Sequence, residues 1–138
     1  MDRKKIRVLL ADDNETLRTE IYRKLNNEFE IVGSVENGQA LLDAFDQTHP
    51  DVVVTDISMP VLDGFEAAEK LARYGNPPIV FLTVHEDRAF IDEARSLGVL
   101  GYVLKRSDPS ILATAIRSVF MHHSFLCPEL SSDSSGQS

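Results

Sequence analysis

The sequence has a single cysteine, an excess of acidic over basic residues and no long apolar run. Cys127 stands alone among 138 residues, which excludes a disulfide within the chain and a zinc site built on cysteines. Lys and Arg number 14 against 22 Asp and Glu, so the net charge is −8. That is the wrong sign for a surface that neutralises nucleic-acid phosphates, and we expect this chain not to bind DNA by itself.

Apolar runs are also too short for a targeting or membrane segment. Only residues 8–11 separate the basic start from Asp12, which is too short for the core of a signal peptide. The longest apolar stretch, residues 79–84, falls far short of a membrane span. We expect no membrane contact, and a lone free thiol fits a reducing cytoplasm.

Short apolar runs do alternate with segments of helical spacing. Nearly continuous runs typical of strands covered on both faces lie at residues 6–11, 30–35, 52–55, 79–83 and 101–104. Each is followed by a helical stripe, and the expected helix-flanking residues are Asn37, Asp63, Gly98 and Asp108. The sequence predicts an α/β domain with a five-stranded parallel sheet flanked by five helices.

The composition changes near the end of the chain. Residues 125–128 are apolar enough to pack back on the domain, whereas residues 131–138 are mostly serine and cannot form a core. We expect one globular domain over residues 1–124 and an interdomain linker or C-terminal tail over residues 125–138.

Polar residues follow four of the five predicted strands. They are Asp12-Asp13, Asp56, Thr83 and Lys105, and ligands of open parallel sheets bind at this end of the strands. If the first and third strands are neighbours, ~4.8 Å separates their backbones, so Asp13 and Asp56 can share one cation. Oxygen ligands of this kind favour Mg²⁺.

Thr83 and Lys105 extend this cluster. On neighbouring strands the Thr83 hydroxyl reaches a group attached to Asp56, and Lys105 is long enough to place its ammonium beside Asp56 or a phosphoryl oxygen. His85 is expected at the rim, two residues past Thr83.

A resemblance to a known family rests on these residues and on three further features. They are the sequence Val-Val-Val-Thr-Asp-Ile-Ser-Met-Pro around Asp56, the pair Asp63-Gly64, and Tyr102. Over roughly residues 5–120, the sequence resembles the receiver domain of response regulators in two-component signalling. The resemblance implies a flavodoxin-like (βα)5 fold with strand order 2-1-3-4-5. It implies that Asp56 accepts a phosphoryl group from a sensor histidine kinase.

The resemblance also implies the metal ligands. Asp13 and Asp56 bind Mg²⁺ directly, the backbone carbonyl of Ser58 is a further ligand, and Asp12 acts mainly through water.

The remaining implied roles concern the phosphoryl group and its readout. Lys105 and Thr83 contact the phosphoryl group, and Tyr102 changes rotamer when Thr83 moves. The chain would catalyse only its own phosphorylation and dephosphorylation.

Two segments resemble the NarL type of receiver, which precedes a LuxR-type helix-turn-helix domain: residues 106–109 and 125–130. By this resemblance the chain is part of a longer cytoplasmic transcription regulator. It forms a homodimer on phosphorylation and reaches DNA only through an output domain absent from this chain.

Other functions remain open at this point. The alternatives are a stand-alone receiver and an interaction module that works without phosphorylation. A phosphatase with an aspartate nucleophile has a second Asp two residues later, where this chain has Ser58. A flavodoxin-like FMN protein is disfavoured by the acidic site and by a first loop without a Ser/Thr-rich phosphate cradle.

Overall fold

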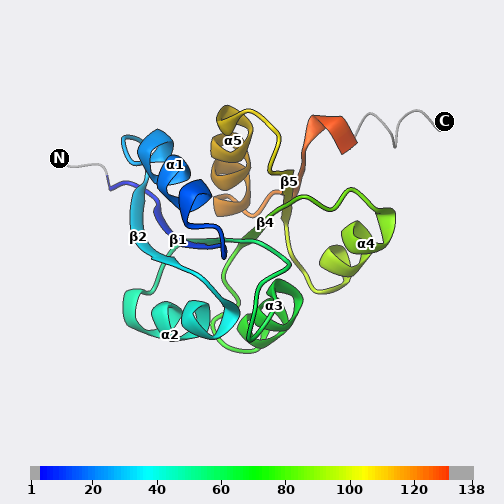
Figure 1. Cartoon of the computed structure of the whole chain (residues 1–138), viewed down its shortest axis with the longest axis horizontal. Helices are drawn as coiled ribbons and strands as arrows, with labels where there is room; N and C mark the ends of the chain where they lie inside the picture. Colours follow the sequence, from blue (N-terminus) through cyan, green and yellow to red (C-terminus); the bar gives the residue numbers. More distant parts are fainter. Residues whose placement is uncertain (1–3, 131–138) are drawn as a thin grey trace.

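The computed structural model describes residues 4–130. Five strand-helix units follow one another, and a short sixth strand comes after the last helix (Figure 1). The elements are β1 Arg7–Ala11, α1 Glu15–Leu25, β2 Glu30–Val35, α2 Gly38–Thr48, β3 Val52–Thr55, α3 Gly64–Ala72, β4 Ile79–Thr83, α4 Arg88–Ser96, β5 Gly101–Leu104, α5 Pro109–Phe120 and β6 Phe125–Leu126.

All strands are parallel, in the order β2-β1-β3-β4-β5-β6. The α/β architecture and the order of the first five strands agree with the prediction, but the predicted number of strands is wrong. The sixth strand pairs Phe125 with Gly101 and Leu126 with Tyr102. Two residues are too few to show a strand period in a sequence, and here the existing edge of β5 supplies the pairing partner.

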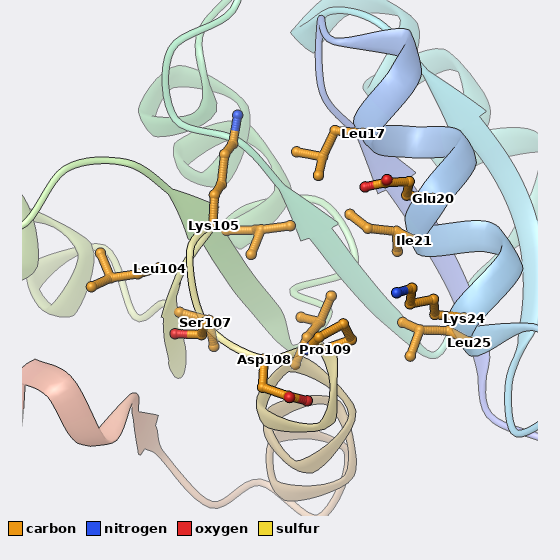
Figure 2. A pocket seen from close by; sticks show the side chains of 13 residues that line it. Leu17, Glu20, Ile21, Lys24, Leu25, Leu104, Lys105, Ser107, Asp108 and Pro109 are labelled. Carbon is orange, nitrogen blue, oxygen red and sulfur yellow. The ribbon is translucent and has the colours of Figure 1, made fainter.

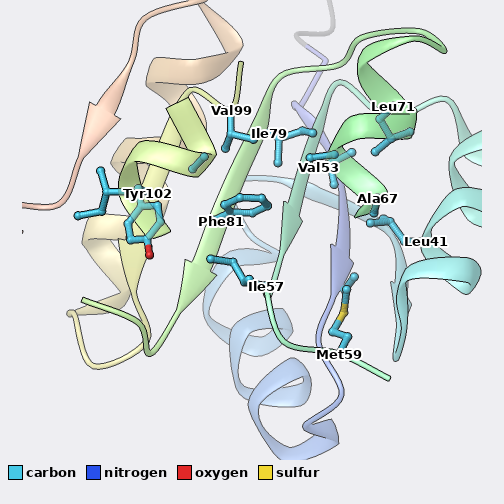
Figure 3. Packing of buried hydrophobic residues seen from close by; sticks show 14 of the residues in the cluster. Leu41, Val53, Ile57, Met59, Ala67, Leu71, Ile79, Phe81, Val99 and Tyr102 are labelled. Atoms are coloured by element: carbon cyan, nitrogen blue, oxygen red, sulfur yellow. The ribbon is translucent and has the colours of Figure 1, made fainter. Parts of the chain in front are cut away.

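Helices cover both faces of the sheet (Figure 1). α1 and α5 lie on one face, and α2, α3 and α4 lie on the other. Alternate residues of β3 point to the two layers: Val52 and Val54 pack with α5, whereas Val53 packs with Leu41 and Ala67 of the opposite layer (Figure 3). The continuous apolar strands therefore arise because both faces are buried.

Predicted helix ends are confirmed by their hydrogen bonds. At the start of α3, Asp63 and Glu66 form a capping box, in which each side chain accepts from the other residue's backbone amide. Asn37 and Asp108 also accept backbone amides at the starts of α2 and α5. Gly98 follows α4 with φ of 83°, a left-handed conformation that glycine adopts without a steric penalty.

Residues 125–130 lie against the domain rather than apart from it. Cys127 is free and fully buried, and Leu130 is 5% exposed. The interdomain boundary at residue 124 stays a prediction, and residues 131–138 lie outside the described part. Within residues 4–130, no helix has the length and apolarity that a bilayer span requires.

Candidate functional site

Three carboxylates meet at the carboxyl ends of β1 and β3. The register pairs Ala11 with Thr55, and the Asp56 amide donates to the Ala11 carbonyl at 2.9 Å. Asp12 and Asp56 therefore leave their strands at the same level. One oxygen from each of Asp12, Asp13 and Asp56 lies within 4.8 Å of the others. This grouping of the three residues agrees with the sequence prediction.

Lys105 reaches this cluster from β5. Its Nζ lies 2.8 Å from Asp12 Oδ2 and 2.9 Å from Asp56 Oδ2, and its backbone amide donates to the Thr83 carbonyl at 2.8 Å. Burial lowers the pKa of Lys105, but its hydrogen bonds to Asp12 and Asp56 outweigh burial and raise the pKa above its usual value. The ammonium is therefore a permanent positive charge in the site.

Asp56 is held at both oxygens. Oδ1 accepts from the Ile57 amide at 2.7 Å and Oδ2 accepts from Lys105 at 2.9 Å. Burial nevertheless raises the pKa of Asp56, and the nearby Asp12 charge adds to this, against the opposing effect of Lys105. The charged form of Asp56 is thus disfavoured where only one cation balances three carboxylates.

The donor set fits a hard divalent cation. Asp12 Oδ2 is buried and, apart from its ion pair with Lys105, has no hydrogen-bond partner among the described residues. Lys105 balances only one of the three carboxylate charges in the cluster, and a divalent cation would balance the other two. Asp13 is exposed, so it offers an oxygen from the solvent side. Carboxylates of this kind hold Mg²⁺ through one or two direct bonds and several waters.

Thr83, His85 and Tyr102 connect the site to the end of β5. The buried Thr83 hydroxyl accepts from the His85 amide at 3.1 Å, and the Tyr102 hydroxyl donates to the His85 carbonyl at 2.8 Å. Tyr102 is only 4% exposed. A rotamer change in which Tyr102 moves into space left by Thr83 therefore starts from a side chain that is already buried. The switch role of Tyr102 stays a prediction.

The His85 ring lies at the rim, as expected from the sequence. It stacks on Phe90 with ring centroids 4.1 Å apart, and its Nε2 is 3.0 Å from Ser58 Oγ. The Ser58 side chain is exposed. The predicted use of its backbone carbonyl as a metal ligand stays a prediction.

Sequence reasoning missed Arg18, and it named Gly64 without its contact to the site. Arg18 of α1 donates to the Asp12 carbonyl at 2.6 Å and so fixes the loop after β1. Gly64 lies against the backbone of Asp56, because a Cβ at residue 64 would collide with the Asp56 carbonyl oxygen. Each contact joins a helix to the loop directly before it, and no periodicity in the sequence marks it.

Two hollows adjoin Lys105, whose ammonium contacts the carboxylates. One has a volume of about 260 Å³ and lies between α1 and the turn after β5, where Leu17, Ile21 and Pro109 give it apolar walls (Figure 2). The other, of about 250 Å³, lies beside Thr83 and Lys105. Both are smaller than the usual binding cavity for a small molecule. Neither of these two hollows is lined by Asp12, Asp13 or Asp56.

Comparisons with known proteins agree with this geometry. The family model described as the response regulator receiver domain matches residues 8–117. The transcriptional regulatory protein DesR of Bacillus subtilis is 37% identical over 130 residues, covering 93% of this chain and 65% of DesR.

Solved structures show the same likeness. The crystal structure of a LuxR-family two-component response regulator from Aurantimonas sp. SI85-9A1 has a TM-score of 0.90 at 26% identity, covering 97% of this chain and 98% of that chain. A structure of two RcsB dimers bound to two parallel DNAs has a TM-score of 0.84 at 25% identity, covering 93% of this chain and 67% of that chain. The present chain spans about half to two thirds of the curated relatives it matches, from 54% of PdtaR of Mycobacterium tuberculosis to 65% of DesR.

Proposed function

The chain belongs to the response regulator receiver family, and from this premise we propose that it is a phosphoacceptor domain that carries its signal on Asp56. The proposal rests on one observation above all. The Lys105 ammonium lies 2.8 and 2.9 Å from two buried carboxylates, Asp12 and Asp56, in a cluster to which Asp13 adds a third. Such a site holds a reactive carboxylate, a cation-binding set and a fixed positive charge together.

Each residue has a chemical task in the proposed reaction. An Asp56 carboxylate oxygen attacks the phosphorus of a phosphohistidine in line, so that a P–O bond forms while the P–N bond breaks and the imidazole leaves. Lys105 then moves its ammonium from the carboxylates toward the transferred oxygens, and the Thr83 hydroxyl donates to one of them. The product is an acyl phosphate on Asp56, which hydrolyses readily and suits a reversible signal.

Asp13 and Asp56 would hold Mg²⁺ directly, with the Ser58 carbonyl as a further ligand and Asp12 acting through water. When bound, this ion would neutralise charge on the phosphoryl oxygens. Asp12 also holds Lys105 in the site at 2.8 Å, so its carboxylate both balances the lysine and faces the cation.

The proposed partners follow from the family and from the relatives. A sensor histidine kinase supplies the phosphoryl group, and phosphorylation favours a homodimer. DNA is contacted through an output domain outside this chain, and the full-length protein regulates transcription in the cytoplasm. The domain acts on no other substrate and catalyses only its own phosphorylation and dephosphorylation.

Intact-protein mass tests the proposal most directly. The purified chain is incubated with acetyl phosphate and Mg²⁺, with Asp56→Asn as the matched control. We expect the wild type to gain one phosphoryl group and the variant to gain none, because the amide keeps the shape of the side chain but is not a nucleophile. Phosphate gain by Asp56→Asn at the wild-type rate would refute the assignment of Asp56.

The same experiment separates the alternatives. Steady release of phosphate without a stable adduct would indicate an aspartate-nucleophile phosphatase, and a yellow complex with added FMN would indicate a flavodoxin-like protein. Absence of any adduct would favour an interaction module that works without phosphorylation.

A further inference from the structure

Residues 125–130, which we call the C-terminal strap, pair with the outer edge of β5 at Phe125–Leu126 and end in a helical turn over residues 128–130 (Figure 1). The Phe125 amide donates to the Leu100 carbonyl at 2.9 Å, and the Cys127 amide donates to the Tyr102 carbonyl at 3.0 Å. Cys127 has no exposed surface and belongs to the same core cluster as Tyr102. The strap is therefore attached both by edge hydrogen bonds and by burial.

Glu129 of the strap contacts the turn that carries Lys105. The Ser107 hydroxyl donates to the two Glu129 carboxylate oxygens at 3.2 and 3.3 Å. The Ser107 amide donates to the Leu104 carbonyl at 3.0 Å, which closes the turn around Lys105. The pKa of Glu129 lies below its usual value, first because of its own backbone amide and further because of Cys127 and Ser107. The acceptor is thus a carboxylate, which makes the stronger, charge-assisted kind of hydrogen bond.

The strap also lies against the residue that anchors the other loop of the site. Tyr102 pairs with Leu126 in the sheet, and its hydroxyl holds the His85 carbonyl at 2.8 Å. The loop between β4 and α4 is therefore fixed to the stretch of β5 that the strap covers. Both loops that carry phosphoryl-contacting groups, Thr83 and Lys105, are linked to residues 125–130.

We propose that Glu129 is a positioning residue for the phosphoryl site, which acts through Ser107 on the turn that carries Lys105. The proposal rests on the proposed function and deepens it, because it names what connects the site to the chain beyond residue 130. A docked strap keeps the Lys105 turn in place, and a released strap lets it move.

The direction of the effect follows from preorganisation. Lys105 must place one ammonium among a few oxygens, and a turn that is already fixed loses less freedom when it binds them. Docking of the strap therefore strengthens binding of a phosphoryl group. Linkage is reciprocal, so a bound phosphoryl group must hold the strap more tightly by the same factor.

Beryllofluoride with Mg²⁺, a mimic of the phosphoryl group, provides the test on the full 138-residue chain. Its dissociation constant is measured by NMR titration for the wild type, Glu129→Ala and Glu129→Gln. We expect Glu129→Ala to weaken binding roughly threefold to tenfold, because only part of the roughly tenfold to hundredfold effect of one lost charge-assisted hydrogen bond is passed through the turn to Lys105. Glu129→Gln should stay within about twofold of the wild type, because its amide oxygen still accepts from Ser107. Both variants lose the same charge, so their difference isolates the hydrogen bond.

Glu28→Gln is the matched control. It removes the carboxylate of an exposed ion pair in which Glu28 lies 2.6 Å from Arg117 of α5. Neither residue belongs to the strap. We expect no change in beryllofluoride binding for this variant. Equal affinity in the wild type and Glu129→Ala would overturn the proposal, and so would an equal loss in Glu28→Gln.

Amide hydrogen exchange gives a second readout that a purely structural role would not change. In the wild type, beryllofluoride should slow exchange at Phe125 and Cys127, whose amides bond β5, and this protection should shrink in Glu129→Ala. Binding of beryllofluoride with no change at these two amides would refute the coupling while leaving the proposed function intact. Failure of the wild type to bind beryllofluoride at all would overturn both.

Discussion

The middle of the sheet and its carboxyl end differ in how well their side chains are matched to their surroundings. Val53 of β3 is fully buried among apolar neighbours. Asp56, three residues further along, is almost as buried but carries a carboxyl group. Asp12 repeats the pattern after β1, with a buried oxygen whose one partner among the described residues is the Lys105 ammonium, 2.8 Å away. Burial stabilises the first kind of residue and is costly for the second. Burial of apolar residues in the middle of the sheet thus offsets the cost of burying charged groups at its carboxyl end.

The largest expected effect comes from the middle of the sheet. Phe81 of β4 is fully buried and contacts the rings of Phe65 and Tyr102. Phe81→Ala should lower the free energy of unfolding by about 3–5 kcal/mol, because it removes apolar contacts and leaves a cavity. Urea denaturation measures this. Tyr22→Ala is the control, since Tyr22 is 47% exposed and its loss should cost about 0.5 kcal/mol or less. Similar losses in the two variants would contradict a core centred on β4.

At the carboxyl end, the expected effect is on ion binding. Asp13→Ala should weaken Mg²⁺ binding at least about tenfold, or about 1.4 kcal/mol, because it removes the exposed oxygen of the three-carboxylate cluster. A Mg²⁺ titration followed by NMR shifts of site residues measures the change. Asp92→Ala removes an exposed carboxylate of α4 outside the cluster and should leave the titration unchanged. An unaltered titration in Asp13→Ala would show that Asp13 is not a ligand.

Replacing the buried carboxylate of Asp56 by a neutral group should stabilise the fold, whereas the substitution in the core destabilises it. Without Mg²⁺ at neutral pH, Asp56→Asn should raise the free energy of unfolding by about 1 kcal/mol, because it relieves a buried charge near Asp12 while Lys105 keeps its second partner. Thermal and urea unfolding measure the difference.

The pH dependence of that difference is a sharper test. The folded-state pKa of Asp56 lies above its usual value, mainly through burial, so the folded wild type takes up a proton before the unfolded chain does. Wild-type stability relative to Asp56→Asn should therefore rise as the pH falls through the folded-state pKa, until the difference disappears. A difference that grows on acidification would mean that the charged form is the favoured one.

The same contrast explains how much the sequence could predict. The bounds of β3, β4 and β5 match the apolar runs, because a strand buried on both faces leaves a continuous run. The bounds of β2 also match, although this edge strand is only partly buried. The grouping of Asp12, Asp13 and Asp56 was also predictable, since parallel strands bring their carboxyl ends to one edge.

Contacts between distant loops were not predictable. Glu129 meets Ser107 across 22 positions, and the Tyr102 hydroxyl meets the His85 carbonyl across 17. Even the contact of Arg18 with the Asp12 carbonyl, six positions earlier, arises only from the way α1 packs on the sheet. Such contacts depend on side-chain directions after the fold has formed, and no period or motif in the sequence encodes them.

The smallest expected effect concerns backbone strain at the carboxyl end. Val61, in the loop between β3 and α3, has φ of 71° and is 79% exposed, so a β-branched residue stands in a left-handed conformation without burial to offset it. Val61→Gly should raise the free energy of unfolding by about 0.5 kcal/mol, because relief of this strain slightly exceeds the entropy that glycine adds to the unfolded chain. Val84→Gly is the control, because Val84 is also exposed, at 66%, but is not among the residues with positive φ. This substitution relieves no strain and only adds entropy to the unfolded chain, so the free energy of unfolding should fall. Urea denaturation of both variants decides the point. A loss of stability of the same size in both would show that the loop after β3 stores no strain, and that burial of charge alone distinguishes the carboxyl end from the middle of the sheet.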